Sequence, residues 1–197
     1  MCYYFMHKHL PKYFIFIDKY NSEFFKYKNK NIGIIYRNYK HIKREKELIK
    51  IAKECKRNRY QLFVSNNIKL AHKVKADGIY VPAFNKTQRF SNLEKKNLKI
   101  LGSAHDQKEI YNKIMQNCET IFLSPLFYIK KSKTFLGIHK FNFISKFNKI
   151  NILPLGGVAL KNIRKLRLLN IRGFGGIRVF KKKTGLKEAG FHKENIF

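Results

Sequence analysis

Short apolar runs recur along the chain, and most are followed by a segment whose apolar positions have helical spacing. The runs span residues 13–17, 32–36, 61–64, 78–81, 99–101, 120–123, 151–158 and 173–180. Near-continuous apolar runs of this length are typical of parallel strands whose two faces are both covered. We therefore predict eight buried parallel strands, the last two of them rich in glycine.

The segments between the runs predict helices. Residues 42–56 carry the strongest pattern, with one charged face and one apolar face. The apolar face is expected to consist of Leu48, Ile49, Ala52 and Cys55. Weaker patterns predict helices at 22–28, 68–74, 107–117 (with Ile110 and Ile114 on one face), 141–147 and 160–169, and a helical turn near Leu93.

Eight strand–helix units within 197 residues fit a single-domain α/β fold, the (β/α)8 or TIM barrel, at the small end of its size range. The barrel is expected over residues 12–180, with an N-terminal extension at 1–11 and a basic tail at 181–197. The alternative is a doubly wound open sheet. No G-x-G-x-x-G motif follows the first strand, which disfavours that alternative.

The charge of the chain is strongly positive, with 43 basic and 12 acidic residues and a net charge of +31. Such a charge favours nucleic acid or an anionic surface as a partner. However, Lys, Asn, Ile, Phe and Tyr are abundant together, all have codons rich in A and T, and the lysines are spread along the whole chain. We therefore expect no sequence-specific nucleic-acid binding, although a nucleic-acid-binding barrel remains an alternative function.

The remaining composition favours a cytoplasmic protein. The three cysteines are far apart, which is typical of a reducing compartment. No apolar run approaches the roughly 20 residues of a membrane span, so we expect no membrane partner. A homo-oligomer stays open.

The glycines near the C-terminus predict a phosphate site. In TIM barrels, the loops after strands seven and eight commonly bind phosphate. Backbone without a Cβ can approach an anion closely and direct N–H groups at it. We expect the amides of Gly156, Gly157, Ile177 and Arg178 to converge on one anion.

Several strand ends together resemble one family, the thiamine phosphate synthase/TenI family. The similarity runs from Leu10 to Phe180 and rests on six motifs in order. They are Leu10-Pro-Lys-Tyr-Phe-Ile-Phe-Ile-Asp18, Ala76-Asp-Gly-Ile-Tyr80, Gly102-Ser-Ala-His105, Phe122-Leu-Ser-Pro-Leu-Phe127, Leu155-Gly-Gly-Val158 and Gly175-Gly-Ile-Arg178.

The resemblance implies an enzyme of thiamine biosynthesis. The synthase joins a pyrimidine diphosphate to a thiazole phosphate and releases pyrophosphate, whereas TenI relatives aromatise the thiazole phosphate or have other roles. Both imply a small phosphorylated ligand held by backbone amides after strands seven and eight. The open alternatives are a synthase-like transferase with an altered diphosphate site and a non-synthase binding or salvage protein.

Departures from the family pattern concern the metal. The synthase holds Mg²⁺ and diphosphate with acidic residues after strands three and four, where this chain has Asn66 and Asn85. Neutral amides are poorer ligands for a hard cation. Tyr39 stands where the family has a lysine after strand two, and Pro125 stands where the tautomerase has its histidine. Mg²⁺ therefore stays open as a cofactor, and no metal ligand is assigned.

The candidate site residues follow from strand ends and from the resemblance. Arg37, Ser103 and His105 are the catalytic candidates, because an arginine can grip a diphosphate and a histidine can move a proton near neutral pH. We expect Asp18 to form a salt bridge. The substrate-binding candidates are Asn66, Asn85, Ser124 and Lys133, although Asn66 and Asn85 could instead cap helices.

Overall fold

The computed structural model describes residues 9–27, 29–39, 44–90 and 98–180. Most of the expected N-terminal extension, the basic tail at 181–197, the turn near Leu93 and the start of the helix expected at 42–56 lie outside the described residues.

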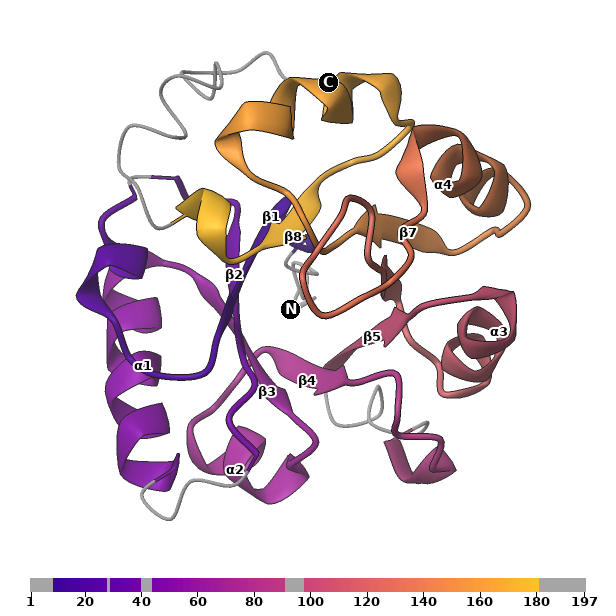
Figure 1. Cartoon of the computed structure of the whole chain (residues 1–197). Helices are drawn as coiled ribbons and strands as arrows, with labels where there is room; N and C mark the ends of the chain where they lie inside the picture. The colour runs from indigo at the N-terminus through magenta and orange to yellow at the C-terminus, as the bar shows by residue number, and fades with distance from the viewer. Residues whose placement is uncertain (1–8, 28, 40–43, 91–97, 181–197) are drawn as a thin grey trace, which may run out of the picture.

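Eight parallel strands form a nearly closed barrel, which confirms the predicted TIM-barrel class (Figure 1). The hydrogen-bonded order is β7-β6-β5-β4-β3-β2-β1-β8, so β8 pairs with β1, while β7 and β8 are the two ends of the order. The strands are β1 (Tyr13–Ile17), β2 (Ile32–Tyr36), β3 (Gln61–Ser65), β4 (Gly78–Val81), β5 (Lys99–Ala104), β6 (Thr120–Leu123), β7 (Asn151–Pro154) and β8 (Phe174–Gly176).

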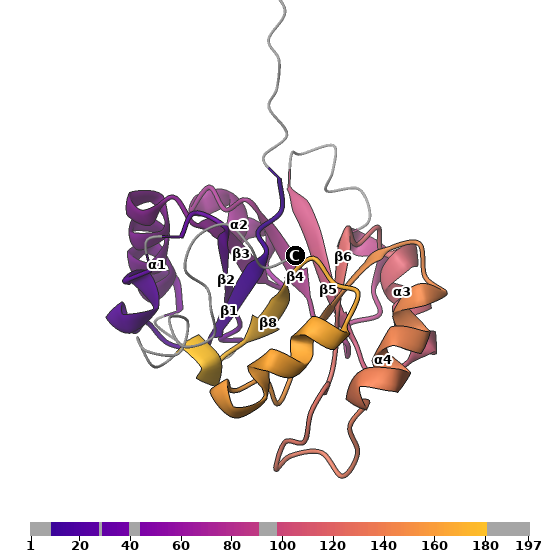
Figure 2. The ribbon, with the colours of Figure 1, turned by 90° about the horizontal axis from the view of Figure 1, so that it is seen from above.

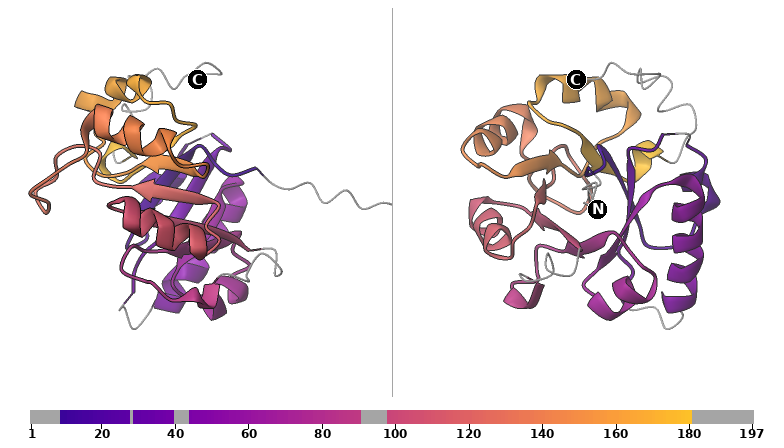
Figure 3. Two further views of the ribbon diagram at one scale, coloured as in Figure 1. Left: turned by 90° about the vertical axis from the view of Figure 1, so that its right-hand side faces the viewer. Right: turned by 180° about the vertical axis from the view of Figure 1, so that it is seen from behind.

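Helices surround the barrel on its outer side (Figure 3). The α-helices are α1 (Arg44–Asn58), α2 (Ile68–Lys73), α3 (Gln107–Met115) and α4 (Gly137–Lys146). Short 3₁₀ helices supplement them: η1 (Ser22–Phe25), η2 (Gln88–Phe90), η4 (Leu160–Leu168) and η5 (Arg178–Phe180).

Four helix predictions need correction. The segment expected as a helix over 22–28 contains the short 3₁₀ helix η1. The segment expected as a helix over 160–169 is a 3₁₀ helix, because its apolar residues recur every three positions, the repeat of that helix. The α1 core face contains Ile51 rather than Ile49, which is 37% exposed. On α3, Ile114 is 39% exposed, and Lys113 is buried instead.

Several element boundaries also differ from the prediction, among them β5, which extends to Ala104, and β7, which ends at Pro154. The helix expected at 141–147 begins earlier, at Gly137, where the chain has a positive φ of 70°. The run at 173–180 is a three-residue strand followed by η5, because the chain turns after Gly176.

The barrel interior is filled mainly by aromatic rings. Phe14, Phe16, Phe63, Tyr80 and Phe122 form one buried cluster with Ile35, Leu101 and Leu153. Edge-to-face pairs such as Phe16–Phe122, with ring centroids 5.1 Å apart, are favourable aromatic contacts. The larger part of the core lies outside the barrel, between the strands and the helices.

Glycines make room for these rings. A Cβ built on Gly33 would lie 2.8 Å from Phe14, and one on Gly175 would lie 2.8 Å from Phe16. The glycine in β8 therefore has a packing role, independent of any ligand.

The two ends of the barrel differ. The loop between β6 and α4 projects from one end, and the first described residues lie towards the other (Figure 2). The carboxyl ends of all eight strands point to the loop side, which is where TIM barrels carry their sites. No helix in the described segments is long and apolar enough to cross a membrane.

Candidate functional site

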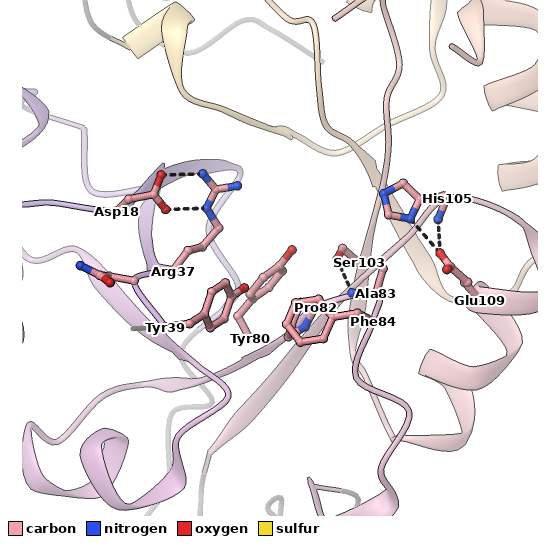
Figure 4. A pocket seen from close by; sticks show the side chains of 11 residues that line it. Asp18, Arg37, Tyr39, Tyr80, Pro82, Ala83, Phe84, Ser103, His105 and Glu109 are labelled. Atoms are coloured by element: carbon pink, nitrogen blue, oxygen red, sulfur yellow. Dashed lines mark hydrogen bonds and ion pairs between the residues drawn. The ribbon is translucent and has the colours of Figure 1, made fainter. Parts of the chain in front are cut away.

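A pocket of about 570 Å³ opens at the carboxyl ends of β1, β2, β4 and β5 (Figure 4). It brings together all three residues predicted to be catalytic, Arg37, Ser103 and His105. The other lining residues are Asp18, Asn38, Tyr39, Tyr80, Pro82, Ala83, Phe84 and Glu109.

Arg37 follows β2 and is held by Asp18, which follows β1. Its Nε and Nη2 atoms donate to the two carboxylate oxygens of Asp18 at 3.2 and 3.0 Å. The guanidinium also lies over the Phe16 ring, 5.4 Å from its centroid. The expected salt bridge of Asp18 is therefore present. It fixes the arginine at the pocket wall, where an anionic ligand would compete with Asp18 for it.

Tyr80 and Ser103 supply neutral hydroxyl groups to the pocket. Tyr80 lies near the end of β4 with its ring in the barrel interior, and its hydroxyl points into the pocket (Figure 4). Burial raises the pKa of Tyr80 well above its ordinary value, so the phenol stays protonated and can donate. Ser103 Oγ accepts a hydrogen bond from the Ala83 amide at 3.1 Å, which ties β5 to the loop after β4.

His105 is oriented by Glu109, a residue that the sequence interpretation missed. Glu109 Oε2 lies 2.9 Å from His105 Nδ1 and also accepts from the His105 amide at 2.7 Å. A proton on Nδ1 directed at the carboxylate leaves Nε2 as the acceptor. The signal available in the sequence was an acid four residues after His105, in the first turn of the helix expected from Gln107.

Asn66 and Asn85 lie beside the pocket and bond to each other. Asn85 Nδ2 donates to Asn66 Oδ1 at 2.7 Å, across the loops that follow β3 and β4. Asn66 caps no helix, because the cap of α2 is its neighbour Asn67, whose side chain accepts from the Leu70 amide. Within the described residues, no group of three or more His, Cys, Asp or Glu side chains is placed to hold a metal ion.

The loop after β4 is held by hydrogen bonds from two side chains at the end of α3. Lys113 Nζ donates to the carbonyl oxygens of Pro82 and Asn85 at 2.9 and 2.7 Å, and to Gln116 Oε1 at 2.8 Å. Gln116 Nε2 donates to the carbonyls of Asn85 and Thr87. Lys113 is only 1% exposed, and burial lowers its pKa to about 8. Nothing in the sequence pattern distinguished it from the many exposed lysines.

The predicted phosphate glycines form a tight loop after β7. Gly156 and Gly157 have positive φ values of 86° and 73°. The Gly156 carbonyl accepts from the Phe127 amide, and the Gly157 carbonyl accepts from Asn162 Nδ2. Their own amides donate no hydrogen bond to another described residue. The carbonyls thus fix the loop, while the N–H groups remain available to an anion.

The remaining predicted residues lie on the segments that follow β6, β7 and β8, on the other side of the barrel mouth from the pocket. Ser124 lies against the glycine loop, with its Cβ 3.6 Å from a Cβ built on Gly156. Ile177 is half-buried against the interior cluster, and Arg178 is exposed. Lys133 is exposed on the projecting loop between β6 and α4. The predicted site residues therefore divide into a side-chain pocket, an amide pair next to it, and a glycine loop.

Comparisons with known sequences agree on one family. The family described as "Thiamine monophosphate synthase" matches residues 24–180. A thiamine-phosphate synthase of Prochlorococcus marinus subsp. pastoris is 30% identical over 125 residues, covering 62% of this chain and 36% of that protein. One from Flavobacterium psychrophilum is 25% identical over 132 residues, covering 62% and 64%. The matches thus span less than two thirds of these curated relatives.

Solved structures share the fold. Thiamine phosphate pyrophosphorylase from Pyrococcus furiosus has a TM-score of 0.70 at 17% identity, covering 91% of this chain and 92% of that one. A 3-keto-L-gulonate-6-phosphate decarboxylase from Vibrio cholerae has a TM-score of 0.65 at 12% identity, with coverage of 92% and 95%. At these identities the likeness establishes the barrel alone.

Proposed function

Because the chain belongs to the thiamine monophosphate synthase family, we propose that it is a transferase of thiamine biosynthesis. It joins a thiazole phosphate to a pyrimidine diphosphate and releases pyrophosphate. The observation that carries this proposal is the gathering of Arg37, Ser103 and His105 in one pocket at the barrel mouth. The protein works in the cytoplasm and binds no specific nucleic acid.

The pocket suits the departure of a diphosphate. When the carbon–oxygen bond to the diphosphate breaks, the leaving group takes the electron pair and gains negative charge. Preorganised donors that face developing charge stabilise it most effectively. Arg37 offers a guanidinium that Asp18 and Phe16 already hold in place, and Tyr80 offers a protonated phenol.

His105 is the group that can move a proton in this pocket. Glu109 fixes its ring from the Nδ1 side, so Nε2 is the atom that meets a ligand. Glu109 lies in the first turn of α3, whose position is set by packing of Ile110 in the core, and His105 lies just before that helix. The dyad therefore has a fixed orientation before any ligand binds.

The thiazole phosphate occupies the other half of the mouth in this proposal. The amides of Gly156 and Gly157 carry no internal hydrogen bond among the described residues, and the carbonyls of this loop are held by Phe127 and Asn162. Such amides bind phosphate without help from any side chain. Ser124 adjoins the same loop.

The reaction is tested by following pyrophosphate release. The protein is incubated with thiazole phosphate and pyrimidine diphosphate together, and with each alone. The proposal predicts pyrophosphate and thiamine phosphate in equal amounts only when both substrates are present. Absence of both products at saturating substrates would contradict it.

A non-synthase binding or salvage protein is the second candidate. It is favoured by the Asn66–Asn85 pair, which stands where the family resemblance implies acidic residues. A thermal-shift panel separates the two candidates, because any ligand that binds only the folded state raises the melting temperature. A binding protein is stabilised by thiazole phosphate or thiamine phosphate but not by the pyrimidine diphosphate, and it forms no product.

A further inference from the structure

The family resemblance implies Mg²⁺ ligands at the positions of Asn66 and Asn85, and the residues present do not fit that cation. A hard divalent cation takes oxygen ligands, preferably charged ones. Asn66 Oδ1 already accepts from Asn85 Nδ2 at 2.7 Å. Asn85 Oδ1 accepts from the Thr87 amide at 2.9 Å and from Thr87 Oγ1 at 3.0 Å. Both side-chain oxygens are neutral and already used.

The two carboxylates that line the pocket are committed as well. Both oxygens of Asp18 accept from Arg37, and Glu109 Oε2 accepts from the amide and ring of His105. Taking either carboxylate as a metal ligand would leave Arg37 or His105 without its partner. The loss of such a charge-assisted bond opposes metal binding.

A buried cation already stands behind the loop that follows β4. The Lys113 ammonium donates to three oxygens, and two of them are the Pro82 and Asn85 carbonyls of that loop. Asn85 is thus bonded through its carbonyl to Lys113 and through its side chain to Asn66. These contacts connect α3, the β4 loop and the β3 loop in one chain of hydrogen bonds.

We propose that the Asn66–Asn85 amide pair and the Lys113 ammonium replace a divalent cation as the link between the loops after β3 and β4. The site is then organised without metal, and Arg37 meets the charge of the ligand's diphosphate. The diphosphate part of this inference rests on the proposed function. The organisation of the two loops does not, and it is tested without substrate.

The first test uses the wild-type protein and hydrogen–deuterium exchange. Exchange is followed over residues 65–67 and 82–87 with EDTA and with saturating Mg²⁺. The proposal predicts equal exchange rates in both segments under the two conditions. If Mg²⁺ slows exchange in these segments, a metal links the loops and the proposal is overturned. Failure of the synthase assay would leave this result unchanged, so the two proposals fail separately.

The second test restores the acids. With Asn66→Asp and Asn85→Asp together, two carboxylates would face each other across a 2.7 Å contact, and their repulsion lowers the melting temperature. Mg²⁺ should raise the melting temperature of this double variant and leave that of the wild type unchanged. Mn²⁺ titration should show binding at least about tenfold tighter in the double variant, because affinity follows ligand charge. Equal Mn²⁺ binding in both proteins would overturn the proposal.

The third test removes the ammonium and keeps its stem. Lys113→Met should increase exchange over residues 82–87 by about tenfold or more, because charge-assisted bonds to that loop are lost. The matched control is Lys108→Met on the exposed face of the same helix, which should leave the exchange unchanged. Unchanged exchange in Lys113→Met would show that the ammonium does not hold the loop. The wild-type comparison decides the metal question if this variant does not fold.

Discussion

The mouth of the barrel has two halves that are built in different ways. At β1 to β5, side chains line a pocket, and each charged group there has a partner, such as Asp18 for Arg37 and Glu109 for His105. At β6 to β8, a glycine loop presents backbone groups, and its neighbours are close enough to exclude a Cβ. The chemistry of the first half depends on which side chains are present, and that of the second half depends on the conformation of the backbone.

This difference bears on the Asn66 and Asn85 positions, where the resemblance implies acids. An acid can become an amide if a new hydrogen bond compensates, as Asn85 does with Asn66. A glycine at positive φ against a neighbouring backbone has no such substitute. We therefore expect the side chains after β3 and β4 to be replaced more easily than the glycines of the loop after β7.

The largest effect is expected in the glycine loop. Gly157 has a φ of 73°, and a Cβ there would lie 2.6 Å from the Phe127 carbonyl carbon. Gly157→Ala combines backbone strain with a clash and should reduce the free energy of unfolding by about 3 kcal/mol or more. Urea unfolding measures this.

Gly137 provides the matched control for that variant. Its φ is 70°, but nothing lies within 4 Å of a Cβ built there. Gly137→Ala should therefore show the conformational cost alone, about 1 kcal/mol. Equal effects of the two alanines would mean that close packing does not constrain the loop after β7.

In the side-chain half, Arg37→Met should weaken ligand binding and leave the stability of the fold largely unchanged. The arginine lies at the pocket wall, and its methylene stem is kept by methionine. Loss of the guanidinium should weaken pyrophosphate binding by about 10- to 100-fold. Isothermal titration measures this, with the exposed Arg172→Met as the control. Equal affinity of the two variants for pyrophosphate would show that Arg37 does not contact the ligand.

The buried Lys113 gives the side-chain half a pH dependence. Burial holds its folded pKa at about 8, below the ordinary value of 10.5. Between these values the folded state binds fewer protons than the unfolded state, so the contribution of Lys113 to stability rises with pH. The adjacent Cys118 thiol stays neutral in this window, because burial raises its pKa to about 12.

The measurement is the difference in unfolding free energy between wild type and Lys113→Met. The unfolding free energy of the wild type, relative to that of the variant, should increase between about pH 7 and about pH 9.5. A constant difference would mean that folding leaves the pKa of Lys113 unchanged, and a shift the other way would mean that folding raises it; either result would contradict the account.

A smaller effect is expected when Asp18 is neutralised. Its carboxylate is largely exposed and would compete with an anionic ligand for Arg37. Asp18→Asn should tighten pyrophosphate binding only severalfold, about the worth of an exposed ion pair, and less at high salt. Weaker binding in this variant would show that Asp18 orients Arg37 more than it competes with the ligand.

The sequence predicted the strands well, because buried parallel strands are short apolar runs with recognisable ends. It also predicted that strand ends would bring Arg37, Ser103 and His105 together, since parallel strands share one mouth. The exact three-residue spacing at 160–169 was a signal for a 3₁₀ helix that the helical interpretation passed over.

Other parts of the site carry no local signal. Asn66 and Asn85 meet across 19 positions, so only the fold shows that they pair. Lys113 looks like any other lysine in a chain rich in them, and its burial depends on the space beside Gly102 and Cys118. Polar contacts between distant loops depend on tertiary structure and not on pattern.

The most direct test of the two-half account is a titration of ¹⁵N-labelled protein with thiazole phosphate, followed by amide chemical shifts. The account predicts the largest shifts at Gly156, Gly157, Ile177 and Arg178, where the backbone would hold the phosphate. Shifts confined to the pocket formed by β1 to β5 would contradict it.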